Sequence, residues 1–312
     1  MRFFWNVLDS KWLIPASLRG FSQVMLIENT LSGCLILFGL VLYSPTFASI
    51  ALLSSIVGTV TGYYYGGDKQ AAHQGIYGFN SLLSGIAVTL FLQSDWRWMI
   101  ALFAALLAAL MMIGVTKILA KWNIPILTFP FVFVTWMGLL ATYQINPVAI
   151  NPAFVASSPV KWNLPMEHAP HFFLGLIKGV GEVFIIDSIS AGSLILIALF
   201  VAGWRYGVYA IIGTFVSWLT ALSFGVNTEM LDLGLYNYNA VLTMIAIGLA
   251  FDDKRRFLLV GIFAAAMTVP ITAGLDLLLN PLGLPILTFP FIISTWLFLA
   301  FRKALPKMEV TL

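Results

Sequence analysis

The chain has 312 residues, of which 60% are hydrophobic and only 9% are charged, and its mean hydropathy is +0.96. An average soluble domain carries about 25% charged residues, so this composition excludes an ordinary water-soluble protein and predicts a chain that lies largely in a lipid bilayer. Cys34 is the only cysteine, which excludes a disulfide or a thiolate metal site within the chain. We expect no cofactor and no nucleic-acid partner.

Residues 1–18 come first and combine aromatic and basic side chains, among them Trp5, Trp12 and Lys11. They show no basic start followed by an apolar run and a small-residue cleavage site, so they do not read as a cleavable signal. We expect an interfacial N-terminal segment that leads into the first span.

Apolar runs then predict ten membrane spans, five in each half of the chain. Several are shorter than the ~20 residues of a straight span, so their polar or Pro-rich ends are expected to lie within protein rather than lipid. In order, the runs are 31–43, 46–66, 76–92, 98–119 and 126–142, then 188–203, 205–225, 236–251, 257–275 and 286–301.

The fold class predicted is an all-α integral membrane protein. Prolines at 147, 152, 159, 165 and 170 mark residues 143–170 as a linker between halves. The expected organisation is an N-terminal segment, a first repeat, an extracytoplasmic linker, a second repeat and a cytoplasmic tail, at 1–18, 19–142, 143–170, 171–302 and 303–312.

Five spans per half is an odd number, so a second repeat would enter the membrane inverted. With the N-terminus inside, 13 of the 16 basic residues fall on the inner side and three fall outside, namely Arg97, Lys161 and Lys178. This agrees with the positive-inside rule. Both termini are therefore predicted to be cytoplasmic, in a bacterial-type inner membrane.

One motif occurs twice in the chain. Residues 124–136 and 284–296 are identical at nine of thirteen positions, at an offset of 160. Thr128 and Thr288 each lie between two prolines, which predicts an extended break followed by a half-helix that starts near Pro130 or Pro290. Free carbonyls, a hydroxyl and a helix N-terminus would then meet near mid-membrane. The alternative is that each threonine bonds to the backbone of its own helix and that the prolines only kink this helix. The duplication of the motif favours a pair of helix breaks instead.

Two further blocks repeat at an offset of 159. Gly20–Val24 aligns with Gly179–Val183, and this pairs Gln23 with Glu182. An intramembrane carboxylate is costly unless it faces water or a partner, so Glu182 is a candidate site residue. The alternative is a structural bond to a backbone donor, or to Lys178, four residues earlier on a helix. Glu28 and Asp187 also align and are interpreted as helix-terminus partners.

The other block aligns Phe79–Leu83 with Tyr238–Leu242 and puts an aromatic ring beside an amide in each half. Such rings are usually packing residues, but their symmetry with the other blocks makes them candidates for the lining of a pore. The candidates from these two blocks are the pairs Phe79 and Tyr238, Asn80 and Asn239, Val24 and Val183, and Leu83 and Leu242.

Several other signals are weaker. Asn151-Pro152-Ala153 matches the tripeptide of water channels, but water channels need one copy in each half. His73, His168 and His171 fall in predicted loops, which weakens an ammonia channel with pore histidines. Gly58, Gly62 and Gly66 form a close-packing ridge, either between subunits or within one. No phosphate-cradling Walker sequence supports ATP-driven pumping.

The motif Leu-Pro-x-x-Thr-x-Pro-Phe at Leu284–Phe291, with Ile124 in place of the leucine in the first half, resembles the signature of the urea transporter family. The similarity runs from about Arg19 to Trp296. It implies a homotrimer in the lipid bilayer, each subunit with its own pore at the interface of two inverted repeats, and a short re-entrant helix in each repeat. It also implies passive movement of urea through a narrow slot.

Carried over by position, the resemblance implies that Thr128 and Thr288 mark the middle of the slot and that Gln23 and Glu182 bind urea at its ends. Phe79, Leu83, Val183 and Leu242 would form walls, and Tyr238 replaces a phenylalanine-like position.

The leading hypothesis is a passive urea channel and not an enzyme, because no nucleophile–base set or metal cluster is present. The alternatives are a proton-coupled transporter of urea or another small polar amide, and an ammonia or water channel.

Overall fold

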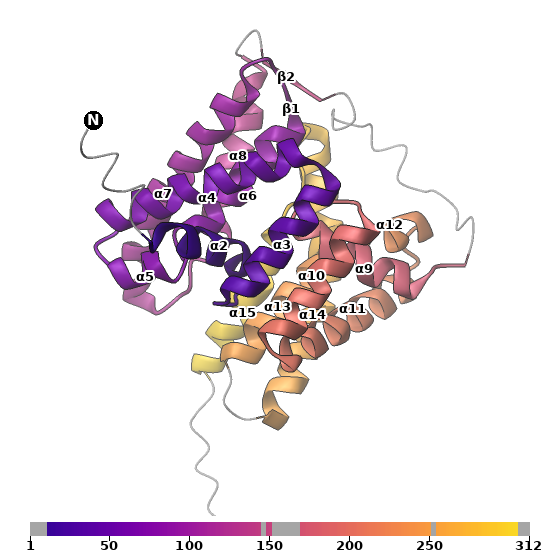
Figure 1. Ribbon diagram of the computed structural model, residues 1–312. Helices are drawn as coiled ribbons and strands as arrows, with labels where there is room; N and C mark the ends of the chain where they lie inside the picture. The colour runs from indigo at the N-terminus through magenta and orange to yellow at the C-terminus, as the bar shows by residue number, and fades with distance from the viewer. Residues whose placement is uncertain (1–10, 145–147, 152–168, 251–253, 305–312) are drawn as a thin grey trace, which may run out of the picture.

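The computed structural model describes residues 11–144, 148–151, 169–250 and 254–304. In this part the chain is almost wholly helical (Figure 1). The elements of the first half are α2 (Leu13–Val24), α3 (Thr30–Tyr43), α4 (Pro45–Tyr65), α5 (Lys69–His73), α6 (Gly78–Phe91), β1 (Leu92–Gln93), α7 (Arg97–Leu119), the 3-10 turn η1 (Ala120–Trp122) and α8 (Phe129–Thr142). Strand β1 pairs antiparallel with β2 (Ala149–Ile150) in the predicted linker.

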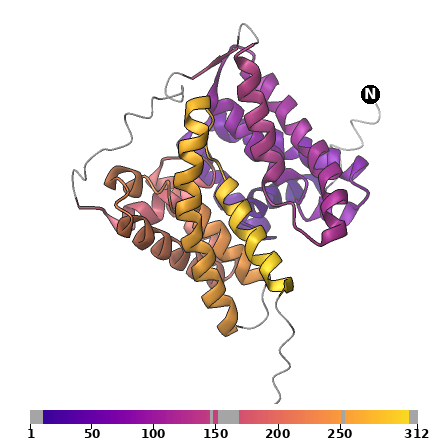
Figure 2. The same ribbon diagram turned by 180° about the vertical axis from the view of Figure 1, so that it is seen from behind.

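The second half repeats this order of helices. Its elements are α9 (Phe172–Glu182), α10 (Ile189–Ala202), α11 (Trp204–Ser223), α12 (Thr228–Asp232), α13 (Tyr238–Ala250), α14 (Lys254–Leu279), the 3-10 turn η4 (Asn280–Leu282) and α15 (Phe289–Ala304). In the view from behind, α14 and α15, orange and yellow, run beside each other (Figure 2). Each half therefore ends in a long helix, a short 3-10 turn, an irregular segment and a shorter helix.

Four helices of the described chain are long and apolar enough to cross a membrane: Pro45–Tyr65, Arg97–Trp122, Trp204–Ser223 and Leu258–Leu282. The shorter apolar helices are Thr30–Tyr43, Gly78–Phe91, Phe129–Thr142, Ile189–Ala202, Tyr238–Leu249 and Phe289–Phe301. Each of the ten predicted apolar runs corresponds to one of these helices, so the prediction of an all-α membrane protein is confirmed.

Hydropathy alone did not identify α2 and α9. They have 12 and 11 residues, well short of the ~20 that a straight span needs, and α2 contains Arg19 within its sequence. The expected boundary between residues 18 and 19 falls inside α2. These two short helices matter because they carry Gln23 and Glu182.

The two halves pack against each other mainly through α3 and α10, which lie side by side in Figure 1. Ser32 on α3 donates a hydrogen bond of 2.8 Å to the carbonyl of Ala198 on α10. Gly39 faces the backbone of Ala191 so closely that a Cβ there would already be in contact. Small residues at this crossing let the two backbones approach, as is usual between helices in a membrane.

The glycine ridge of α4 packs within the subunit. A Cβ on Gly62 would lie 2.0 Å from the ring of Tyr77, and one on Gly58 would lie 2.3 Å from the hydroxyl of Ser81. The hydroxyl of Tyr77 also donates to the carbonyl of Gly66 at 3.3 Å. The structure therefore resolves the choice that the sequence left open, because these glycines admit Tyr77 and the start of α6.

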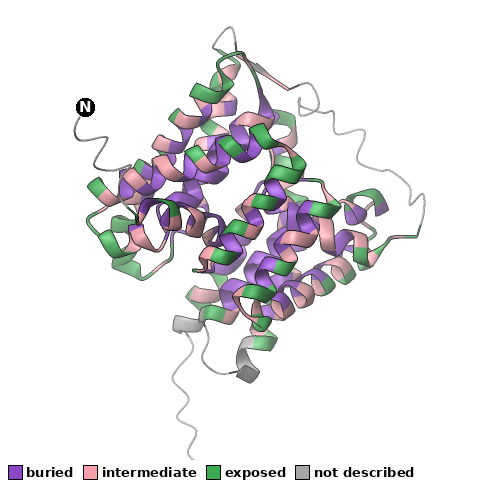
Figure 3. Cartoon of the chain, viewed as in Figure 1, coloured by how far each residue is buried: buried purple, intermediate pink, exposed green. Residues whose placement is uncertain are grey.

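Exposed residues follow the outer faces of the helices (Figure 3), and many of them carry large apolar side chains. Examples are Phe38, Phe103, Phe215 and Phe263, each more than half exposed. A water-soluble protein rarely exposes so much apolar surface. In a bilayer these faces meet lipid tails or a neighbouring subunit.

Asn151 belongs to the tripeptide that matches the water-channel motif, and it lies beside the C-terminal end of α6. Its backbone N–H donates to the carbonyl of Phe91 at 2.8 Å, and its side chain donates to that of Leu90 at 3.3 Å. Both bonds go to terminal carbonyls of a helix, which need partners. This residue therefore has a structural role; Pro152 and Ala153 lie outside the described residues.

Candidate functional site

The repeated motif forms an irregular break in each half, as predicted. After η1 the chain passes through residues 123–128, and α8 begins at Phe129 with Pro130 in its first turn. After η4 it passes through residues 283–288, and α15 begins at Phe289. Leu127 and Leu287 both have a φ of 53°, in the left-handed region that non-glycine residues rarely adopt. The same unusual backbone is therefore built twice.

The structure brings the two predicted threonines together. The side-chain oxygens of Thr128 and Thr288 lie 2.6 Å apart, and either hydroxyl can donate. Both residues are buried, with at most 2% of their surface exposed. Each hydroxyl stands just before the N-terminus of a half-helix, which carries a partial positive charge, so two such N-termini lie near one place in the protein interior.

Asn80 and Asn239 hold the breaks in shape. The side-chain nitrogen of Asn80 donates to the carbonyl of Leu127 at 3.1 Å, and its oxygen accepts from the backbone N–H of Phe131 at 3.1 Å. Asn239 makes the same two bonds in the second half, to Leu287 at 3.2 Å and from Phe291 at 3.1 Å. Each amide thus satisfies a carbonyl in the break and an N–H at the start of the next helix.

The two aromatic residues beside these amides behave differently. Phe79 and Tyr238 are both buried, at 5% and 8% exposure. The hydroxyl of Tyr238 donates to the carbonyl of Leu287 at 2.6 Å, a bond that Phe79 cannot make. The carbonyl of Leu287 therefore receives two donors, from Tyr238 and Asn239.

The predicted wall residues are Val24, Val183, Leu83 and Leu242. All are buried, at 0–1% exposure. They belong to one apolar cluster that also contains Phe79, Tyr238 and the two leucines of the breaks. These side chains, from α2, α6, α13 and the C-cap of α9, therefore belong to the same apolar core as the two breaks.

Gln23 and Glu182 lie in the last turns of α2 and α9 and are partly exposed. The side-chain nitrogen of Gln23 donates to the carbonyl of Gln74 at 3.0 Å.

Lys178 does not neutralise Glu182 by direct contact. It forms an ion pair with Asp187 at 2.8 Å instead, so the alternative of a Lys178–Glu182 bond is wrong. Within the described residues the Glu182 carboxylate has no hydrogen-bond partner. A carboxylate at a helix C-terminus also meets the negative end of the helix dipole, which disfavours its ionised form.

Asp187, interpreted as a helix-terminus partner, forms an ion pair with Lys178 on α9, whereas the side chain that caps α10 is the neighbouring Ser188. Glu28 is exposed beside Asn29, the residue whose side chain caps α3.

Sequence reasoning missed the turns that follow Gln23 and Glu182. Leu26 and Ile185 have φ values of 61° and 58°. Their N–H groups donate to the carbonyls of Gln23 and Glu182, both at 2.9 Å. Glycine is the usual residue at such a helix end, and a left-handed β-branched isoleucine is a genuine outlier. Only the repetition at an offset of 159 could have drawn attention to them.

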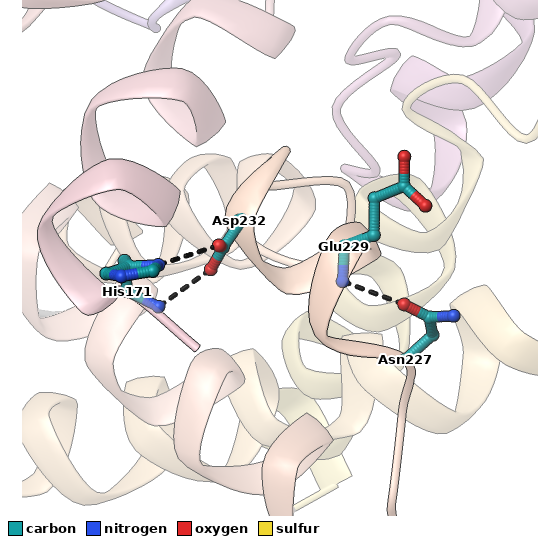
Figure 4. A network of polar contacts seen from close by, with 4 residues as sticks. All are labelled: His171, Asn227, Glu229 and Asp232. Atoms are coloured by element: carbon teal, nitrogen blue, oxygen red, sulfur yellow. Dashed lines mark hydrogen bonds and ion pairs between the residues drawn. The ribbon is translucent and has the colours of Figure 1, made fainter. Parts of the chain in front are cut away.

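Hydrogen bonds between His171 and Asp232 join the start of α9 to α12. Asp232 on α12 accepts from the backbone N–H of His171 at 2.7 Å and lies 3.0 Å from its ring nitrogen Nδ1 (Figure 4). In the same view Asn227 caps α12 by accepting from the N–H of Glu229 at 2.7 Å.

His73 ends the short helix α5. Neither His171 nor His73 lies in a long apolar helix, which agrees with the argument against pore histidines; His168 lies outside the described residues. In the part of the chain described, no three His, Cys, Asp or Glu residues come together as a metal site.

Comparison with known proteins gives a family and several relatives. The family model "Urea transporter" matches residues 14–303. The protein "Urea transporter 1" from sheep, Ovis aries, is 30% identical over 301 residues, which cover 93% of this chain and 77% of the sheep protein. The proteins of the same name from goat, Capra hircus, and mouse, Mus musculus, are 30% and 28% identical with the same coverage.

Proposed function

We propose, from the fact that the chain belongs to the urea transporter family, that it is a multi-pass membrane protein which conducts urea passively through a channel. The observation that carries this proposal is the pair of buried threonine hydroxyls, 2.6 Å apart at two matching helix breaks. A transporter family also agrees with the expectation that the protein is not an enzyme.

The proposed pore lies at the interface of two inverted repeats, each with five spans and a re-entrant segment. The shared order of helices supports this arrangement, and so do the matched bonds of Asn80 and Asn239. Interrupted helices in matching positions of two halves are typical of transport sites near the bilayer midplane. The first repeat is proposed to start with α2, at Leu13 rather than at residue 19, and the second to span residues 171–302.

Urea is flat, neutral and strongly dipolar, with one carbonyl acceptor and four N–H donors. Buried hydroxyls at Thr128 and Thr288 offer acceptors for those N–H groups where water is excluded. Half-helix N-termini at α8 and α15 favour the carbonyl end of the solute. Asn80 and Asn239 are proposed to act indirectly, because their amides already bond the backbone of the breaks.

The walls and the two ends of the pathway are proposed from the same properties of urea. Apolar side chains admit a flat neutral body and repel hydrated ions; the wall residues proposed are Phe79, Leu83, Leu242, Val24, Val183 and Tyr238. Gln23 and Glu182 are proposed to accept N–H groups at the two ends. No counter-ion is needed, because urea carries no charge.

Orientation and assembly rest on charge and on the family resemblance. The excess of basic residues on one side, 13 of 16, supports cytoplasmic termini and an extracytoplasmic linker at residues 143–170, in an inner membrane. The exposed apolar faces are compatible with contacts to lipid and to two further subunits of a homotrimer.

Urea flux into proteoliposomes tests the function. Stopped-flow light scattering with urea, water, ammonia and short amides is expected to show selective urea permeability that an imposed pH gradient does not change. Uphill accumulation of urea driven by a proton gradient would establish a proton-coupled transporter instead. This is the second candidate function, because the Glu182 carboxylate has no hydrogen-bond partner among the described residues. Dominant permeability to ammonia or water would establish the other channel class.

A further inference from the structure

Two tryptophans exchange hydrogen bonds between the halves. The indole N–H of Trp136 on α8 donates to the carbonyl of Pro285 at 2.8 Å, and that of Trp296 on α15 donates to the carbonyl of Pro125 at 2.8 Å. The exchange is reciprocal, since each half supplies one donor and one acceptor. Both acceptors lie in the breaks that contain the threonines.

Each indole also contacts the other end of the same break. The ring of Trp136 packs edge-on against Phe289 with centroids 5.0 Å apart, and the ring of Trp296 lies 5.9 Å from that of Phe129. Pro285 and Phe289 flank Thr288, three residues before it and one after it. Each tryptophan therefore holds both sides of the threonine that belongs to the opposite half.

The proline carbonyls and the indole N–H groups each need the other as a hydrogen-bond partner. A proline carbonyl in an irregular segment has no helical N–H to satisfy it, and an indole N–H within a membrane protein is usually paired with an acceptor. Without water in the bilayer core, each group finds its partner only within the protein. Because the bonds join the two halves, they fix how closely the breaks approach each other.

We propose that Trp136 and Trp296 are positioning residues that set the spacing of Thr128 and Thr288 and thereby the size limit of the pathway. The part that concerns size selectivity rests on the proposed function, whereas the part that concerns spacing does not. Neither tryptophan contacts the permeant in this proposal; both act through the threonines.

The spacing is tested without transport. In a Cys34→Ser background, Thr128→Cys and Thr288→Cys place two thiols where the hydroxyls now touch. A disulfide needs Cβ atoms about 3.5–4.5 Å apart, so oxidation is expected to cross-link the pair rapidly while both tryptophans are present. Adding Trp136→Phe and Trp296→Phe keeps aromatic rings but removes both N–H donors, and cross-linking is expected to slow by at least about tenfold, because disulfide geometry is strict.

Size selectivity is tested with urea and N,N′-dimethylurea in proteoliposomes. The double variant Trp136→Phe with Trp296→Phe, without the cysteines, is expected to raise the permeability ratio of dimethylurea to urea by at least about twofold, because one net hydrogen bond already accounts for a factor of about two to ten. Trp218→Phe is the matched control, because the buried N–H of Trp218 has no partner in the described structure. This control is expected to change neither measurement.

If the double variant does not fold, the single variants Trp136→Phe and Trp296→Phe are measured in the same assays. Each of them removes one of the two hydrogen bonds. Absence of cross-linking in the parent, or an unchanged cross-linking rate or selectivity in the tryptophan variants, overturns the proposal. If the cysteine pair cross-links as expected but the protein that keeps both threonines passes no urea, the proposed function is refuted and the spacing result stands.

Discussion

The hydroxyl of Tyr238 donates to the carbonyl of Leu287 at 2.6 Å, whereas the aligned residue of the first half, Phe79, has no hydroxyl. Among the described residues, the carbonyl of Leu287 therefore accepts from two donors, whereas that of Leu127 accepts from one, Asn80. A carbonyl oxygen has two lone pairs. The two breaks thus share a backbone shape but differ by one free acceptor, and this asymmetry makes a prediction.

Tyr238→Phe is expected to free one lone pair of the Leu287 carbonyl for a urea N–H, and so to lower the urea concentration at half-maximal flux. The lost bond is expected to lower the free energy of unfolding by about 0.5–1.5 kcal/mol. The converse change, Phe79→Tyr, adds a donor to the first break and should raise that concentration. Flux measured across a range of urea concentrations checks both; a shift in the same direction in both variants would contradict the argument.

Thr128→Val and Thr288→Val are each expected to reduce urea flux by about tenfold or more. Valine keeps the shape of threonine but leaves urea N–H groups and the remaining hydroxyl without a partner, at a cost of roughly 1–3 kcal/mol. Stopped-flow light scattering measures the effect.

Thr135→Val and Thr295→Val are the matched controls, because these buried hydroxyls lie on the same helices, α8 and α15, and have no hydrogen-bond partner in the described structure. They are expected to retain near-parental flux. Parental rates from Thr128→Val and Thr288→Val would refute their place in the pathway.

Asn80→Leu is expected to destabilise the fold by about 2–5 kcal/mol, because it leaves both the carbonyl of Leu127 and the N–H of Phe131 buried without partners. Thermal unfolding in detergent checks this value. Ser84→Ala on the same helix is the control, since the buried hydroxyl of Ser84 has no partner among the described residues. If both variants unfold at the parental temperature, Asn80 does not support the break.

Glu182→Gln is expected to retain most of the urea flux, because an amide oxygen can accept the same N–H groups and Gln23 occupies the aligned position. Glu182→Leu is expected to abolish most of it, since one end of the pathway then loses its acceptor in an apolar wall. Flux at several pH values separates the two candidate functions. If the carboxylate carries protons, glutamine will be as inactive as leucine.

The sequence by itself determined the membrane class, the ten apolar helices and the place of the two breaks. These properties are local or repeated: apolar runs require a bilayer, and prolines on both sides of a threonine prevent a continuous helix wherever the chain goes. The duplication also identified Thr128 and Thr288 as partners, because two halves of like sequence place like residues in like positions.

Only the tertiary structure decided which groups satisfy one another. The indole of Trp136 reaches Pro285 across 149 positions, Lys178 pairs with Asp187 rather than Glu182, and the glycines of α4 admit Tyr77. Sequence patterns report which faces of a helix are apolar, but hydrogen bonds and close contacts depend on distances between elements. Those distances are set by the packing of the two halves, and this is why the bond from Tyr238 to Leu287, which Phe79 cannot match, became visible only in three dimensions.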